Sequence, residues 1–79
     1  MKLGKLYHAK FSFRAVFNTK EAARLFGEEP IRYIGPKDFF VLIDQDGYML
    51  KILTKYGELG WINTENLIFN FHFEEFNSY

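Results

Sequence analysis

The feature that most constrains the fold is a regular alternation of side chains over residues 7–17. One face carries Tyr7, Ala9, Phe11, Phe13, Ala15 and Phe17, and the other carries His8, Lys10, Ser12, Arg14 and Val16. A period of two is that of a β-strand, whose successive side chains point to opposite sides. We therefore predict one long, half-buried strand here, with its phenylalanines facing the core.

A short helix is predicted next. Asn18 offers a capping oxygen, Glu21 follows three residues later, and Gly27 can end the helix in a left-handed conformation. These signals predict a helix over residues 19–26. Its apolar face would consist of Ala22, Leu25 and Phe26.

The rest of the chain predicts further strands separated by turns. The strands are expected at residues 31–34, 39–43, 48–54, 59–63 and 67–73, with turns at 35–36, 44–47 and 55–58. Residues 39–43 are apolar on both sides, which indicates a central strand. We predict a mainly β fold, a small five- to six-stranded antiparallel barrel with one helix near 19–26. The residues expected to be mostly buried are Phe39, Val41, Leu50, Ile52, Ile62 and Leu67.

Length and composition narrow the class of protein. A chain of 79 residues forms one small domain, for which we expect residues 74–79 to be a flexible tail. There is no cysteine and no apolar run long enough to span a bilayer, and residues 1–5 lack the long apolar stretch expected of a signal peptide. We therefore expect a cytoplasmic protein that has no contact with a membrane.

Aromatic residues make up 20% of the chain, more than so small a core can hold. Exposed aromatic surface on a small protein usually marks a binding site for a partner. The predicted protein-binding residues, on or beside the turns, are Tyr33, Tyr48, Tyr56 and Trp61. On this basis the sequence favours a protein-interaction module, such as a small inhibitor or modulator of a larger protein.

Residues 46–53 and 57–67 are similar to the C-terminal half of bacterial Src-homology-3-like domains, a resemblance that covers about residues 35–68. It implies a five-stranded barrel in which Gly57 and Gly60 shape a hairpin, with Ile62 and Leu67 pointing inward. Recognition of proline-rich peptides is not implied. The positions that grip such ligands in the family hold Tyr48, Met49, Asn63 and Asn66 here.

Catalytic and metal sites are not predicted. His8 and Ser12 share a strand face but would lie roughly 13 Å apart, too far for a base and its nucleophile. Two histidines without cysteine make a poor metal site, and the calcium-loop-like start at Asp44 has Lys55 where the closing Glu is required. We expect a non-enzyme without cofactors.

Charge is divided unevenly along the chain. Residues 1–37 carry eight basic and three acidic residues, net +5, and residues 38–79 carry two basic and seven acidic, net −5. The alternative function is therefore binding of single-stranded nucleic acid by the basic, aromatic first strand. The residues concerned are His8, Lys10, Ser12 and Arg14.

The two terminal strands, 7–17 and 67–73, hold more aromatic side chains than a five-stranded barrel can bury. They are expected either to pair with each other or to seek another chain, and we favour a homodimer. Opposite charges would set the register of this pairing, Lys10 and Arg14 against Glu74 and Glu75.

Overall fold

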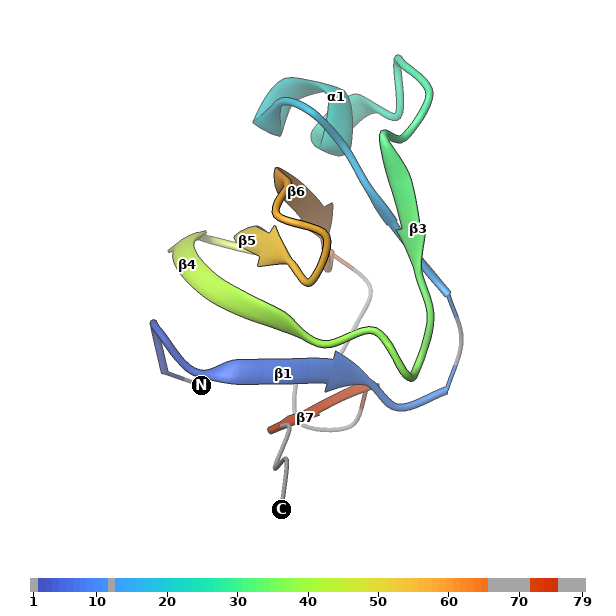
Figure 1. The fold of residues 1–79 in the computed structure, drawn as a ribbon. Coiled ribbons are helices and arrows are strands. Elements are labelled where there is room, and N and C mark those ends of the chain that lie inside the picture. The colour runs from blue at the N-terminus through green and yellow to red at the C-terminus, as the bar shows by residue number, and fades with distance from the viewer. Residues whose placement is uncertain (1, 12, 66–71, 76–79) are drawn as a thin grey trace.

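The computed structural model describes residues 2–11, 13–65 and 72–75. Its elements are β1 (Leu6–Ala9), β2 (Arg14–Val16), α1 (Lys20–Leu25), β3 (Arg32–Ile34), β4 (Phe40–Asp46), β5 (Met49–Thr54), β6 (Leu59–Asn63) and β7 (Phe73–Glu75). Five strands form an antiparallel sheet in the order β6-β5-β4-β1-β7, and β2 pairs with β3 in a second sheet (Figure 1). The fold is thus mainly β, and the described strands do not close into a barrel.

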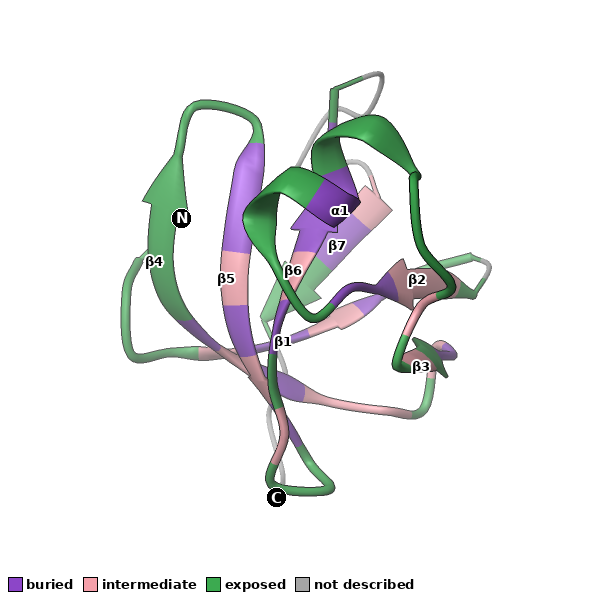
Figure 2. Cartoon of the chain, turned by 90° about the horizontal axis from the view of Figure 1, so that it is seen from above, coloured by how far each residue is buried: buried purple, intermediate pink, exposed green. Residues whose placement is uncertain are grey.

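The main core lies between the two sheets. Its fully buried members are Ala9, Val16, Ile34, Phe40, Leu42, Leu50 and Ile52, joined by Tyr7, Ile62 and Phe73. Figure 2 shows buried residues along β5 and β6 and in the part of α1 beside them. The prediction of a central strand is confirmed, because β4 is the middle strand of five.

The predicted core was correct in part. Leu50, Ile52 and Ile62 are buried as expected, while Leu67 lies outside the described residues. Phe39 and Val41 are only half-buried, because their neighbours in β4 take the core face of the strand. β4 also continues to Asp46, so the turn predicted over 44–47 is shorter and centred on Gly47 and Tyr48.

The single strand predicted over residues 7–17 is wrong. The chain leaves the large sheet after Ala9 and enters the small one at Arg14. In β1 the odd-numbered residues face the core, whereas in β2 the core side holds Val16. An alternation that looks continuous therefore belongs to two sheets, and Phe11 and Phe13 are 57% and 67% exposed rather than buried.

The helix forms as predicted, but with different ends. Thr19 is its N-cap and accepts a hydrogen bond from the Ala22 amide at 3.0 Å, and Phe26, in place of Gly27, is its left-handed C-cap. α1 buries its two alanines and leaves Leu25 and Phe26 exposed, contrary to prediction. No helix in the described part of the chain is long and apolar enough to cross a membrane.

The two ends of the chain meet in the large sheet. β7 pairs with β1, and Ala9 lies opposite Phe73. Residues 74 and 75 belong to β7, so the tail predicted from residue 74 is wrong at these positions, while 76–79 lie outside the described residues. The side-chain contact between the strands is His8 Nε2–Glu74 Oε1 (2.9 Å), and no ion pair of Lys10 or Arg14 occurs among the described residues.

Candidate functional site

The four aromatic residues predicted to bind a protein do not form one cluster. Tyr33 is 60% exposed on β3, while Tyr48 and Tyr56 are in the turns at opposite ends of β5. Trp61 is half-buried on β6. The structure places these residues on separate parts of the surface, each with its own neighbours.

Tyr56 is held by charged side chains of its own chain. The guanidinium carbon of Arg32 lies 3.9 Å from the centre of its ring, and the Lys55 ammonium lies 5.3 Å from it. Its hydroxyl donates to Asp38 Oδ1 over 3.4 Å. Arg32 in turn pairs with Glu58, and Lys55 pairs with Asp38 at 2.7 Å. This network joins the β5–β6 turn to β3 and gives Tyr56 a structural role.

The same network shifts the pKa values of its charged groups. Hydrogen bonds from Lys55 and from the Gly35 amide (2.8 Å) lower the pKa of Asp38. A hydrogen bond from Arg32 lowers the pKa of Glu58, and each base has its pKa raised by its carboxylate partner. Every shift favours the charged form, so these groups act as ion pairs and not as an acid or base tuned for catalysis near neutral pH.

Trp61 is packed against the helix side of the sheet. The ammonium groups of Lys20 and Lys51 lie 5.6 Å and 6.0 Å from the centre of its ring. Its backbone exchanges two hydrogen bonds with Phe17, at 2.8 Å and 2.9 Å, which connect β6 to the segment after β2. Much of Trp61 therefore serves the contact between the large sheet and the residues around α1.

The residues of the predicted nucleic-acid surface are also separated. His8, on β1, is engaged by Glu74. Lys10 is exposed, and Ser12 lies outside the described residues. Arg14 starts β2 in the other sheet, on the same side of that sheet as the buried residues. The structure does not bring His8 and Arg14 onto one strand face.

The opposite charges of the two halves of the chain are used within the fold. Three ion pairs between Lys or Arg and a carboxylate are described, and two of them join the basic first half to the acidic second half: Lys20–Asp46 and Arg32–Glu58. The asymmetry in sequence therefore has a structural explanation, because the two halves lie against each other.

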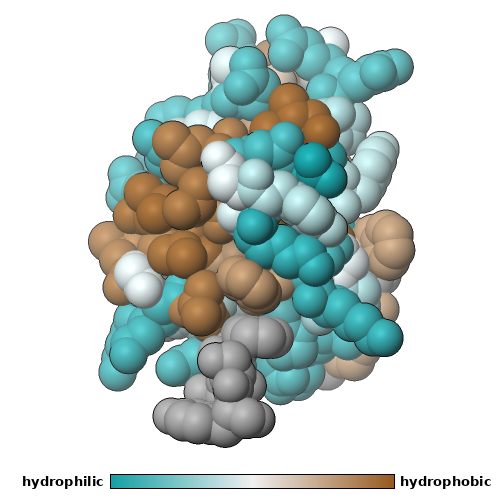
Figure 3. Space-filling view, in the orientation of Figure 1, coloured by the Kyte–Doolittle hydropathy of each residue, from teal (hydrophilic) through white to brown (hydrophobic). Residues whose placement is uncertain are grey.

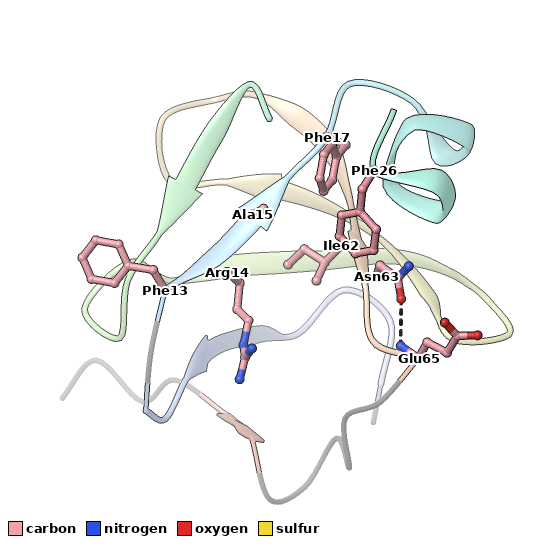
Figure 4. A pocket seen from close by; sticks show the side chains of 8 residues that line it. All are labelled: Phe13, Arg14, Ala15, Phe17, Phe26, Ile62, Asn63 and Glu65. Carbon is pink, nitrogen blue, oxygen red and sulfur yellow. Dashed lines mark hydrogen bonds between the residues drawn. The ribbon is translucent and has the colours of Figure 1, made fainter. Parts of the chain in front are cut away.

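An open groove of about 220 Å³ lies between β2 and the end of α1 (Figure 4). It is lined by Phe13, Arg14, Ala15, Phe17, Phe26, Ile62, Asn63 and Glu65. The rings of Phe17 and Phe26 meet edge to face, with centroids 5.5 Å apart. Sites for small molecules usually measure about 300–1,000 Å³. This groove is smaller, and its size suits one large side chain.

The polar end of the groove is fixed by Asn63. Its Nδ2 donates to the Ala23 carbonyl at 3.0 Å, and its Oδ1 accepts from the Glu65 amide at 2.8 Å, the dashed line in Figure 4. Near it, Arg14 Nε is buried and has no hydrogen-bond partner in the described part of the structure. The residues that line the groove thus combine aromatic rings with a carboxylate and a guanidinium.

Phe26 is the unusual residue of the groove. Its backbone is left-handed (φ 53°, ψ 35°), and no other non-glycine residue among those described has a positive φ. This conformation costs an L-residue about 1–2 kcal/mol, and glycine or asparagine is common at such a cap. The ring is nevertheless 65% exposed. Sequence reasoning missed this role, because Gly27 offered the more usual cap.

A second apolar surface lies on part of the outer face of the large sheet, the face that does not bear the core between the sheets. Leu6 pairs with Val41, Val41 with Leu53, and Leu53 with Leu59, so the four side chains form one row across β1, β4, β5 and β6. We call these four residues the outer row. Leu59 is 53% exposed and the other three are half-buried. Figure 3 shows apolar side chains gathered over these strands.

Helix α1 covers only one end of this outer face. Met49 and Asn63 are opposite each other in β5 and β6, and both contact α1 residues. The next pair along is Lys51 and Trp61, and then comes the outer row. The solvent side of an antiparallel sheet is normally polar. The outer row departs from this pattern.

Within the described part of the chain, no three His, Asp or Glu residues are placed to hold a metal ion. No protein-family model, curated protein or solved structure matches this chain. The groove and the outer row are therefore the features from which a function can be inferred.

Proposed function

We propose that this chain is a non-catalytic protein-interaction module whose groove between β2 and α1 receives a large apolar side chain of a partner protein. A small inhibitor or modulator of a larger protein would bind in this way. The observation that carries the proposal is Phe26, an exposed aromatic residue in a strained backbone conformation at the groove.

A glycine at position 26 would relieve the left-handed strain, and the ring of Phe26 gives little burial in return. Residues that cost stability without filling the core occur most often where a protein binds something. Aromatic side chains are also enriched among the residues that contribute most to binding between proteins.

We also propose that residues 35–68 belong to a Src-homology-3-like barrel, as their resemblance to that family implies, with the described strands forming an open part of it. Two glycines support this. Gly57 takes φ 82° in the β5–β6 turn. A Cβ at Gly60 would collide with the Val16 side chain and lie 2.9 Å from the Phe17 carbonyl oxygen, so β6 runs close to the second sheet. A solved structure with hydrogen bonds continuous around all strands would test the barrel.

Selection of random peptides displayed on phage against the immobilised protein tests the groove. We expect the enriched peptides to share one aromatic or large aliphatic residue. Phe26→Gly should weaken their binding at least about tenfold, as loss of a central aromatic contact does. Its free energy of unfolding should stay level or rise by up to about 1 kcal/mol, because relief of strain offsets the lost contact with Phe17.

Leu25→Ala is the matched control. Leu25 precedes Phe26, is 60% exposed and does not line the groove, so this variant should bind the peptides as the wild type does. Full binding by Phe26→Gly, or selected peptides without an apolar residue, would contradict the proposal. Recovery of single-stranded nucleic acid from a lysate, lost on nuclease treatment, would support the alternative function.

A further inference from the structure

The outer row is arranged so that it can match a second copy of itself. Its residues lie on β6, β5, β4 and β1 in that spatial order. A two-fold axis parallel to the strands, midway between β5 and β4, exchanges β5 with β4 and β6 with β1. Under this rotation Leu53 of one copy meets Val41 of the other, and Leu59 meets Leu6.

The charged residues beside the row obey the same symmetry. Lys51 of β5 lies opposite Asp44 of β4 on this face. Lys51 is the next residue of β5 on this face after Leu53, and a shift of register between Leu42 and Asp44 separates Asp44 from Val41. Neither Lys51 nor Asp44 forms an ion pair among the described residues. The rotation that superposes the apolar row places Lys51 of each copy against Asp44 of the other. Apolar contact and charge therefore favour the same arrangement.

We propose that the protein forms a homodimer in which two large sheets pack face to face through the outer row, with reciprocal Lys51–Asp44 pairs across the interface. A two-fold contact between identical copies requires a self-complementary patch, whereas binding of a different protein does not. Sheets that pack in this way interdigitate their side chains. None of the six residues involved lines the groove, so this proposal and the groove proposal can fail separately.

Sedimentation equilibrium of the full chain over about 1–100 µM tests association in the range expected of a modest interface. The weight-average mass should rise from 9.4 kDa toward twice that value. Leu53→Lys should keep the mass at 9.4 kDa throughout. Far-UV circular dichroism and urea unfolding show whether this variant folds.

Charge reversals test the symmetry itself. In the dimer, Lys51→Asp alone places an acid opposite Asp44 of the other copy at both symmetry-related contacts. Asp44→Lys alone places a lysine opposite Lys51 of the other copy at both. Each single variant should dimerise at least about tenfold more weakly than the wild type. An equimolar mixture of the two should recover wild-type association, because each contact then joins opposite charges. A role for the Lys51–Asp44 pair within one chain cannot produce this rescue.

Lys10→Asp, a reversal at an exposed residue away from the row, is the control and should dimerise normally. A wild-type protein that stays at 9.4 kDa up to 100 µM overturns the dimer. Association that survives Leu53→Lys, or single reversals that the mixture does not rescue, overturns this interface. In each of these cases the peptide-binding test of the groove is unaffected.

Discussion

Both faces of the large sheet carry apolar side chains, yet the two faces differ in what covers them. On one face Phe40, Leu42 and Ile52 are fully buried against the second sheet. On the other, Val41 and Leu53 alternate with them along the same strands and remain partly exposed. The same strands thus carry one surface that stabilises the fold and one that is left partly exposed. The apolar character of the side chains does not distinguish the two faces. What distinguishes them is that the second sheet packs on one face and not on the other.

The strongest test of this comparison changes two neighbouring residues on opposite faces. Ile52→Ala should lower the free energy of unfolding by about 2–5 kcal/mol, because it removes a fully buried side chain and leaves a cavity. Leu53→Ala should cost about 1 kcal/mol or less, because Leu53 is already partly in contact with water. Urea unfolding at low protein concentration measures both variants without a contribution from association. Equal losses would show that the outer row is as important for folding as the core.

A substitution at Gly60 tests how closely the second sheet packs against the core face of the large sheet. Its Cβ would meet the Val16 side chain and the Phe17 carbonyl oxygen, and a backbone oxygen cannot move aside cheaply. Gly60→Ala should therefore destabilise the protein by about 1–3 kcal/mol, the usual cost of overpacking. Gly27→Ala is the control, since nothing lies within 4 Å of the added methyl group. A tolerated Gly60→Ala would mean that the two sheets are less tightly packed than described.

The meander of β4, β5 and β6 was predictable because its alternation, turns and glycines all indicate the same structure. The region from residue 7 to 17 was not, because its alternation is equally consistent with one strand or with two. A change of sheet between Ala9 and Arg14 leaves no mark on the pattern of polarity. It does change which residues face the core, and this is why Phe11 and Phe13 were misplaced.

The candidate surfaces were even harder to predict from the sequence. The two-sided apolar character of residues 39–43 was visible, but it indicated a strand buried on both faces, and only the structure shows one face uncovered. The outer row depends on register, which pairs Val41 with Leu53 of the next strand and with Leu6, a residue distant in sequence. The role of Phe26 depends on its left-handed backbone conformation, which the residue type at that position does not predict.

The smallest expected effect concerns the ion pairs Lys55–Asp38 and Arg32–Glu58, the second of which includes the residue before Leu59 at the exposed end of the outer row. The pKa values of Asp38 and Glu58 are lowered by Lys55 and Arg32 in the folded protein, so both carboxyls bind protons more weakly there than in the unfolded chain. Their contribution to stability is complete above the unfolded pKa values, about 4, and is lost as the pH falls through the folded ones. Asp38→Asn should therefore lose less stability than the wild type between about pH 5 and pH 2 in urea unfolding. Glu28→Gln, at an exposed loop position, should follow the wild-type curve, and the same acid-induced loss in all three proteins would place the pH dependence elsewhere.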